Sequence, residues 1–309
     1  MVLSISNFKN CRVYITLGIG LLGVLCIVML NWYISTHFEE DEQRTETRFW
    51  MNKAKPTKKF DMVFVGDSRC YRGIDPAVFE KELGLQAFNA GFSSGGHNAE
   101  IYNHISNNLL SESRRNNRMI VLAITPYSMS DEARGNQQLQ ALLNKKESAH
   151  QKYTDILFKK KIISRLKKVS KKKTFVREIY HANGWCETLK NISEKSQKRG
   201  LDIYNAIYIK NSFSRKSFDE LTEYTNRWMK DDIRVFAFVP PTTPDMKKLE
   251  ETKSGCDMHI VKAAFEKAGG VWIDIEDEHK YSAYDSSHLS GDQAVVLSKY
   301  LSRKIREML

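Results

Sequence analysis

Residues 61–69 read DMVFVGDSR, in which four apolar residues run straight into Gly66-Asp67-Ser68. A short apolar run that is rich in β-branched or aromatic residues and closed by glycine is typical of a buried strand. Similar runs recur at residues 85–89, 119–124, 234–239 and 271–275. Helical patterns separate these runs. The sequence therefore predicts an α/β domain, a three-layer sandwich in which helices cover both faces of a mainly parallel five-stranded sheet.

The helical patterns fall at residues 76–83, 100–110, 218–230, 260–268 and 291–308. Because each lies between two predicted strands or after the last one, they can serve as the crossovers that parallel strands require. We place this domain at residues 60–309.

An uncharged apolar segment of 22 residues precedes the domain, at 13–34. A helix needs roughly 20 such residues to cross the hydrocarbon core of a bilayer. The segment is longer than the apolar core of a cleaved signal peptide, so we predict one transmembrane helix. A short basic tail, 1–12, precedes it and a polar stalk, 35–59, follows it. This order favours a single-pass anchor with a cytoplasmic tail and the domain outside the cytoplasm, in the periplasm or at the cell surface.

A basic insertion interrupts the alternation of strands and helices at residues 131–217. Its segment 144–199 holds 17 Lys or Arg against five Asp or Glu, whereas the whole chain has a net charge of +11. We expect the insertion to be mainly helical. The segment is either a solvated helical face or an arm that meets an anionic membrane surface or an acidic polymer. Nucleic acid is not an expected partner, because the domain is predicted to lie outside the cytoplasm.

Cysteine and histidine spacing gives no framework for a metal or cofactor. The five cysteines include no C-x-x-C pair, and a Cys186–Cys256 disulfide is left open. His97 and His104 have no third ligand in the sequence, so we predict no metal and no cofactor.

Ser68 lies where open α/β sheets bind ligands, just past the carboxyl end of a strand. A serine at the start of a helix can use free backbone N–H groups to stabilise an oxyanion. The alternative is that Asp67 or Ser68 only caps that helix.

Asp285 and His288 stand three residues apart in a loop between the last strand and the last helix. A serine becomes a good nucleophile when a base takes its proton and a third group orients that base. His288 could face Ser68 while Asp285 holds its other nitrogen, although a purely structural loop would have the same spacing. Gly91, after the second strand, could turn its N–H toward a ligand or form an ordinary turn.

Together these three blocks resemble the SGNH/GDSL hydrolase superfamily, with its flavodoxin-like fold. The matches are Gly66-Asp67-Ser68, Asn89-Ala90-Gly91 and Asp285-x-x-His288. The resemblance implies that Ser68 is the nucleophile, that Asp285 and His288 complete the triad, and that Gly91 and the N–H of Ser68 form the oxyanion hole. We also predict that the substrate contacts four residues: Asp67, Arg69, Asn89 and Tyr127. For Arg69 the alternative is a salt bridge within the protein.

One departure concerns the family's third block, Gly-x-Asn-Asp, whose Asn donates to the oxyanion. The third strand here ends in Thr125-Pro-Tyr127-Ser128, without an Asn. Either Thr125, Tyr127 or Ser128 substitutes for it, or the enzyme works on a slow, specialised substrate. The Asn of the third block is also missing, by resemblance, from the DltD-like and alginate-acetylation-like envelope branches. The motifs GDSRxxxGIDP and DSSHLS of this sequence are similar to those branches.

The sequence thus predicts a membrane-anchored serine acyltransferase or esterase. It would act on a cell-envelope glycan or glycolipid, for example in O-acetyl transfer through an acyl-Ser68 intermediate, with a membrane-bound O-acyltransferase as a possible partner. The alternative is a non-catalytic binding or scaffold protein that retains the fold.

Overall fold

A computed structural model describes residues 40–112, 118–145 and 176–309, together with Leu25 and Met29. The chain divides into two compact units, Met1–Arg48 and Phe49–Leu309. Within the described residues, no helix is both long and apolar enough to cross a membrane. The predicted transmembrane helix and the tail before it lie outside these residues, apart from Leu25 and Met29, and both stay predictions.

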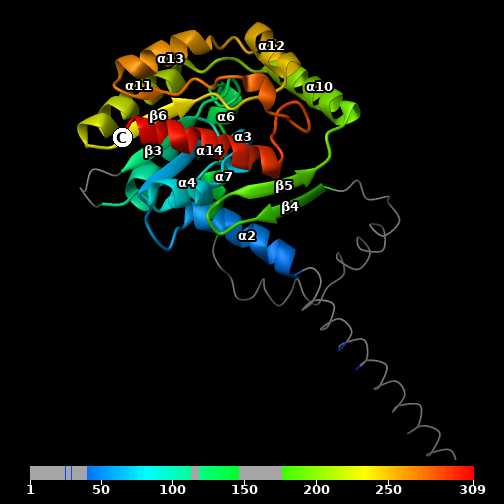
Figure 1. Cartoon of the computed structure of the whole chain (residues 1–309), viewed down its shortest axis with the longest axis horizontal. Helices are drawn as coiled ribbons and strands as arrows, with labels where there is room; N and C mark the ends of the chain where they lie inside the picture. Colours follow the sequence, from blue (N-terminus) through cyan, green and yellow to red (C-terminus); the bar gives the residue numbers. More distant parts are fainter. Residues whose placement is uncertain (1–24, 26–28, 30–39, 113–117, 146–175) are drawn as a thin grey trace, which may run out of the picture. The chain divides into compact units, whose positions relative to one another are not determined.

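Five parallel strands form the central sheet of the second unit, in the order β2-β1-β3-β6-β7 (Figure 1). Their bounds are β1 Met62–Gly66, β2 Ala87–Asn89, β3 Met119–Ala123, β6 Arg234–Phe238 and β7 Val271–Trp272. Counted along this sheet alone, the order is 2-1-3-4-5, which is that of flavodoxin-like folds. Every residue of β1, β2 and β3 is buried, which explains their continuous apolar sequences. The predicted parallel five-stranded sheet is confirmed.

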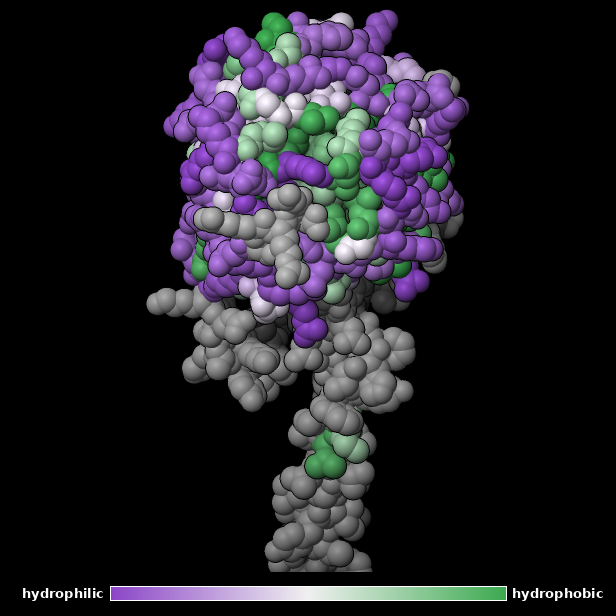
Figure 2. Space-filling view, turned by 60° about the vertical axis from the view of Figure 1, so that its left-hand side comes forward, coloured by the Kyte–Doolittle hydropathy of each residue, from purple (hydrophilic) through white to green (hydrophobic). Residues whose placement is uncertain are grey.

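Helices cover both faces of the sheet, as predicted. Val63 and Val65 point into a core with α5 Ala99–His104, α11 Arg215–Lys230 and α13 Met258–Lys267. Met62 and Phe64, which alternate with them, point into a core with α4 Pro76–Leu83 and α14 Gly291–Glu307. Figure 1 shows α11 and α13 along the top of this unit, with α14 and α4 below them. Because the apolar residues fill these two cores, the face in Figure 2 is mostly hydrophilic, with a limited hydrophobic area near its centre.

Several helices around the sheet differ from the predicted helical patterns or were not among them. The helix predicted over 100–110 leaves α geometry after His104 and continues as a π-helix, η2 Ile105–Leu109. Between β6 and α13 lies α12 Pro244–Lys253, which was not predicted because its sequence is mostly polar and buries only Met246 and Glu250. Two short helices flank the loops of the site, α3 Ser68–Gly73 and η3 Glu278–Lys280.

The predicted stalk ends earlier than expected, because α2 spans Glu40–Ala54 and the second unit begins at Phe49. Phe49, Lys53 and Ala54 are buried against the sheet unit. These residues share one face of a helix, and the many charged residues around them conceal that face in the sequence.

The described part of the insertion is not only helical. It contains α6 Asp131–Arg134, α7 Gln138–Leu143 and α10 Glu194–Lys210, but also an antiparallel hairpin, β4 Val176–Tyr180 and β5 Cys186–Lys190. The turn between the two strands includes Gly184, whose φ of 85° favours glycine. Helices still hold more residues of this part than the hairpin does, so the hairpin is an addition to the expected helices. Residues 146–175 lie outside the described ones.

Cys186 and Cys256 are buried free thiols, so the disulfide that the sequence left open does not form. Burial raises the pKa of each thiol to about 12, which keeps both protonated at neutral pH.

Candidate active site

Ser68 is the first residue of α3, directly after β1. The turn between strand and helix is tight, because a Cβ at Gly66 would lie 2.6 Å from the carbonyl oxygen of Ala123. Asp67 caps the helix by accepting a hydrogen bond from the N–H of Arg69 at 2.8 Å. The cap that the sequence offered as an alternative therefore exists, but Asp67 supplies it. The half-buried side chain of Ser68 is left at the carboxyl edge of the sheet.

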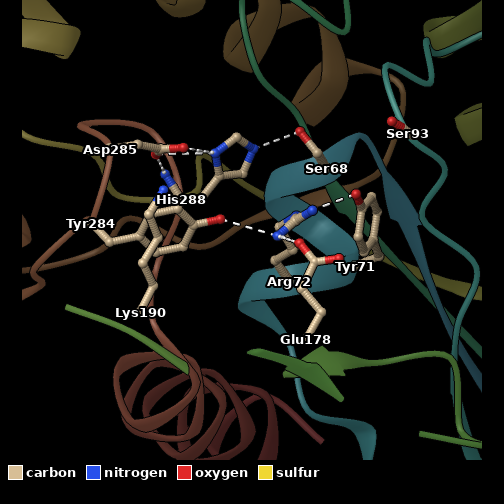
Figure 3. A pocket seen from close by; sticks show the side chains of 9 residues that line it. All are labelled: Ser68, Tyr71, Arg72, Ser93, Glu178, Lys190, Tyr284, Asp285 and His288. Carbon is tan, nitrogen blue, oxygen red and sulfur yellow. Dashed lines mark hydrogen bonds and ion pairs between the residues drawn. The ribbon is translucent and has the colours of Figure 1, made fainter. Parts of the chain in front are cut away.

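Ser68, His288 and Asp285 form a hydrogen-bonded chain (Figure 3). The Oγ of Ser68 lies 2.7 Å from Nε2 of His288. Nδ1 of His288 lies 3.0 Å from Oδ2 and 3.1 Å from Oδ1 of Asp285. Since the carboxylate can only accept, Nδ1 carries the proton and Nε2 is left to accept the hydroxyl proton of Ser68. The three residues that the sequence singled out thus meet with the geometry of a nucleophile, a base and an orienting acid.

Asp285 is held in its ionised form. Burial by itself raises the pKa of this carboxyl, but the charge and hydrogen bonds of His288 lower it well below its usual range. The N–H groups of Ser287 and His288 also donate to Oδ1, at 3.1 and 2.9 Å. A fixed negative charge here would stabilise the imidazolium that forms when His288 takes the proton of Ser68.

Helix α10 supports the loop that carries Asp285 and His288. A Cβ at Gly200 would lie 1.8 Å from the carbonyl oxygen of Asp285, so the helix and the loop touch through backbone atoms. Ser286 adopts a left-handed conformation, with φ at 71°, and its Oγ donates to the carbonyl of Gln197 at 3.1 Å. Such a conformation is costly outside glycine and persists where neighbours enforce it.

Arg69 does not reach the pocket, so its predicted contact with the substrate is wrong. Its guanidinium forms a buried ion pair with Glu250 of α12 at 2.5 Å, and the two side chains are 1% and 6% exposed. Its Nε donates to Ser287 at 2.8 Å, and Ser287 in turn donates to Tyr204 at 2.9 Å. The alternative of an internal salt bridge is confirmed. The ion pair links the helix of Ser68 to α12, and the hydrogen bond to Ser287 links the same helix to the loop of His288.

Asp67 and Asn89, also predicted to contact the substrate, are buried inside the protein. Asp67 accepts a hydrogen bond from the hydroxyl of Thr125 at 2.6 Å. The amide of Asn89 donates to the carbonyls of Cys70 and Ile74, at 2.9 and 3.0 Å. Both residues therefore brace the turn around Ser68 instead of facing a ligand.

The predicted oxyanion role of Gly91 is also corrected. Its N–H donates to Oδ1 of Asn89 at 3.0 Å and is not available to a substrate. Ser93, two residues further along the loop, lines the pocket together with Ser68. Within the described part of the chain, the N–H groups of Ser68 and Ser93 have no acceptor, which leaves both as candidate donors for an oxyanion.

None of the three residues proposed to replace the missing Asn is free to do so. Thr125 donates to Asp67, and Ser128 donates to the carbonyl of Thr125 at 2.9 Å. Tyr127 is buried, with its ring centroid 6.4 Å from that of Tyr204, and it does not line the pocket. Its predicted contact with the substrate is therefore wrong as well.

A pocket of about 330 Å³ opens beside Ser68. Figure 3 shows the residues that line it: Ser68, Tyr71, Arg72, Ser93, Glu178, Lys190, Tyr284, Asp285 and His288. Arg72 could have been foreseen, because it lies one helical turn after Ser68. Glu178 and Lys190 carry no such signal, since they come from the hairpin and reach the site only through tertiary folding.

A buried lysine of α2 supports two loops near the pocket. The ammonium of Lys53 donates to the carbonyls of Asn89 and Gly184, at 2.6 and 2.8 Å, and lies 4.4 Å from the ring centroid of Phe49. Burial lowers the pKa of Lys53 to about 7. This residue was missed because its segment was interpreted as a stalk.

His97 and His104 are structural residues. Each is buried, and its Nε2 hydrogen-bonds a backbone carbonyl, that of Ala123 at 3.2 Å and that of Lys53 at 2.7 Å. Across the described ranges, no three His, Cys, Asp or Glu side chains are grouped so as to hold a metal ion.

No protein-family model and no curated protein matches the sequence. Among solved structures, the chain is similar to a lipase/acylhydrolase from Enterococcus faecalis, with 12% identity and a TM-score of 0.40 over 80% of this chain and 96% of that one. It is also similar to a lipolytic protein of the G-D-S-L family from Desulfitobacterium hafniense (11% identity, TM-score 0.38, 78% and 97% covered). A third similar structure is that of a carbohydrate acetylesterase from Sinorhizobium meliloti. It has 10% identity and a TM-score of 0.34 over 82% of this chain and 100% of that one.

These likenesses are loose, and the chemistry of the site follows from its own residues. A hydroxyl nucleophile, an imidazole base and an ionised carboxylate lie in hydrogen-bonding order beside an open polar pocket. Acyl transfer through a serine ester is the reaction that such an arrangement performs. The class of protein that the fold and the site define is an α/β serine hydrolase or acyltransferase.

Proposed function

We propose that this protein is a membrane-anchored serine esterase or acyltransferase that acts on O-acyl groups of a cell-envelope glycan or glycolipid. The observation that carries the proposal is the chain from Ser68 through His288 to Asp285 at the mouth of the polar pocket. The apolar segment at 13–34 supports the anchor, and the resemblance of the motifs to the DltD-like and alginate-acetylation-like branches supports the envelope substrate. A membrane-bound O-acyltransferase would then supply the acyl donor.

The reaction consists of two acyl transfers. Oγ of Ser68 attacks the carbonyl carbon of the ester while its proton passes to Nε2 of His288. The tetrahedral intermediate collapses, the bond to the leaving alkoxide breaks, and the alkoxide takes the proton from His288. A sugar hydroxyl or water then gives its proton to His288 and attacks the acyl carbon of acyl-Ser68. The bond from that carbon to Oγ breaks, Oγ takes the proton back from His288, and the new ester or the free acid leaves. The N–H groups of Ser68 and Ser93 would stabilise the oxyanion in both steps.

The lining of the pocket supports a sugar ester over a long acyl chain. Seven of its nine residues are Ser, Arg, Glu, Lys, Asp or His, the other two are tyrosines with hydroxyl groups, and no aliphatic residue is among them. Such a surface can hydrogen-bond the hydroxyls of a sugar, whereas a long acyl chain would leave these polar groups unpaired.

The direct test is acylation of Ser68 in the full-length chain, held in detergent and incubated with 4-nitrophenyl acetate. Intact mass should show one added acetyl group on the wild type and none on Ser68→Ala, because only Ser68 is activated by His288. Ser282→Ala is the matched control, since Ser282 is exposed and does not line the pocket. Asp285→Asn should reduce kcat by about 10⁴-fold, as expected for loss of the orienting carboxylate. An adduct on Ser68→Ala equal to that on the wild type would contradict the proposal.

A binding or scaffold function is the second candidate, and the missing block-three donor favours it, because Thr125 and Ser128 are committed to internal hydrogen bonds. A serine-directed fluorophosphonate separates the two. Labelling that is lost in Ser68→Ala supports the enzyme, whereas the absence of labelling and of acetylation together supports the binding protein.

A further inference from the structure

One wall of the pocket carries two cationic side chains from different elements. Arg72 comes from α3, one turn after Ser68, and Lys190 comes from the end of β5. Tyr284 lies between them, since its hydroxyl accepts from Nη1 of Arg72 at 3.1 Å and its ring centroid lies 4.7 Å from Nζ of Lys190. Figure 3 shows this tyrosine and both cations around the pocket below the line from Ser68 to Asp285.

The guanidinium of Arg72 is held by several hydrogen bonds and still has N–H groups that can bind a ligand. Its Nε donates to Tyr71 at 3.2 Å, and its Nη1 donates to Thr188 at 3.1 Å and pairs with Glu178 at 2.6 Å. Its Nη2 has no partner among the residues that the structure describes. A guanidinium held this firmly loses little entropy when a ligand binds it.

Lys190 is a cation of the pocket lining whose charge no described carboxylate neutralises. The two carboxylates that line the pocket already have cationic or proton-donating partners, because Glu178 pairs with Arg72 and Asp285 pairs with His288. Within the described ranges, Lys190 forms no ion pair, and its ammonium rests over the face of Tyr284. It is partly buried, so an anion that reached it would be less screened than one on an open surface.

We propose that Lys190, assisted by Arg72, forms a subsite for an anionic group, a carboxylate or a phosphate, carried by the ester that Ser68 attacks. This inference rests on the proposed function and narrows its substrate class to O-acylated acidic sugars. Lys190 is then a specificity-determining residue. It binds a part of the substrate that does not react, and it leaves the transfer chemistry to the triad.

The test compares three acetyl esters of one sugar ring on the full-length enzyme in detergent: O-acetylated methyl glucoside, methyl glucuronide and methyl glucoside 6-phosphate. Wild type should favour one or both anionic esters by about 10- to 100-fold in kcat/KM, the value of one hydrogen bond to a charged group. Lys190→Met keeps the apolar stem over Tyr284 and removes the charge. It should lower kcat/KM for the anionic esters to about the level of the neutral ester and so abolish this preference, whereas any loss on the neutral ester should be much smaller. Comparison of the carboxylate and phosphate arms identifies which anion fits.

Lys198→Met is the matched control, because Lys198 is exposed on α10 and does not line the pocket. Equal losses on neutral and anionic esters in Lys190→Met, or no preference in the wild type, would overturn the subsite. A second measurement separates this failure from a failure of the proposed function. Binding of methyl glucuronide to Ser68→Ala, followed by calorimetry, should weaken by about 10-fold or more when Lys190→Met is added. If no ester is turned over but this binding and its loss are seen, the subsite stands and the catalytic proposal falls.

Discussion

Gly200 and Ser286 show how single residues fix the acid and the base of the site. At Gly200 the helix α10 approaches the carbonyl of Asp285 so closely that no side chain fits between them. Ser286 holds the loop in a left-handed turn that places Asp285 and His288 on the same side. Neither residue touches the pocket, yet both determine where the imidazole points.

Gly200→Ala should therefore impair catalysis more than folding. The added methyl group forces α10 and the loop apart, and a displacement near 1 Å at a catalytic group can cost about 100-fold in rate. Ester hydrolysis and a thermal unfolding curve, measured on the same preparation, check this. Gly135→Ala is the matched control, because a Cβ there meets nothing closer than 3.4 Å. A wild-type kcat in Gly200→Ala would contradict this prediction, because it would mean that the loop shifts without moving His288.

Among the elements, α2 has the least expected role. Its second half belongs to the sheet unit, where Lys53 donates to the carbonyl of Asn89 at the end of β2 and to that of Gly184 in the hairpin turn. A chain shortened to residue 60 would lose this lysine and the ring of Phe49, whereas a chain that begins at residue 35 would keep both. The part of α2 from Phe49 onward thus supports the segments that surround the pocket.

Lys53 makes the stability of the fold depend on pH. The folded chain holds a pKa of about 7, mainly because of burial, against 10.5 for an ordinary lysine. Between these values the unfolded chain binds a proton that the folded chain does not, so the free energy of unfolding rises with pH by about 1.4 kcal/mol per unit. Urea unfolding of wild type and Lys53→Met at pH 7, 7.4 and 7.8 checks this, because the buried thiols are the same in both proteins and cancel when the two are compared. The free energy of unfolding should rise more steeply with pH in the wild type than in the variant. Parallel curves for the two proteins would contradict it.

For the whole molecule, the basic insertion divides into two parts. Its hairpin and α10 build the pocket and support the catalytic loop. Residues 146–175, outside the described part, hold 11 Lys or Arg and two Asp or Glu. The predicted contact with an anionic surface can therefore be tested on these residues without disturbing the site.

Replacing 146–175 by a short Gly-Ser linker, in a chain that begins at residue 35, should weaken binding to vesicles that contain phosphatidylserine and leave hydrolysis of 4-nitrophenyl acetate intact. Each basic residue near such a surface contributes about 1 kcal/mol, so the loss should be large and should shrink at high salt. Cosedimentation with vesicles measures it, with neutral vesicles as the control. Unchanged binding would favour the alternative of a solvated face.

The sheet and the triad could be predicted from the sequence because both follow from local patterns. Parallel buried strands produce continuous apolar runs, and their carboxyl ends meet at one edge, so Ser68 and His288 were expected to lie near each other. The roles of Arg69 and Gly91 could not be predicted in this way. Arg69 turns inward toward Glu250, 181 residues away, and the N–H of Gly91 turns toward Asn89. Directions of this kind depend on packing between distant segments, which no motif records.

The hairpin gives the site a modular construction. Ser68 begins α3, and Asp285 and His288 come from the loop before α14. Glu178 and Lys190 come from fifteen contiguous residues, Val176–Lys190. Exchanging that segment could retarget the enzyme without touching its chemistry, provided that the carbonyl of Gly184 still receives Lys53 and the indole of Trp185 still donates to the carbonyl of Arg72. After gene duplication, changes in this hairpin alone could alter which substrate each copy accepts. A library in which different hairpins are grafted at Val176–Lys190 would test the same idea in the laboratory.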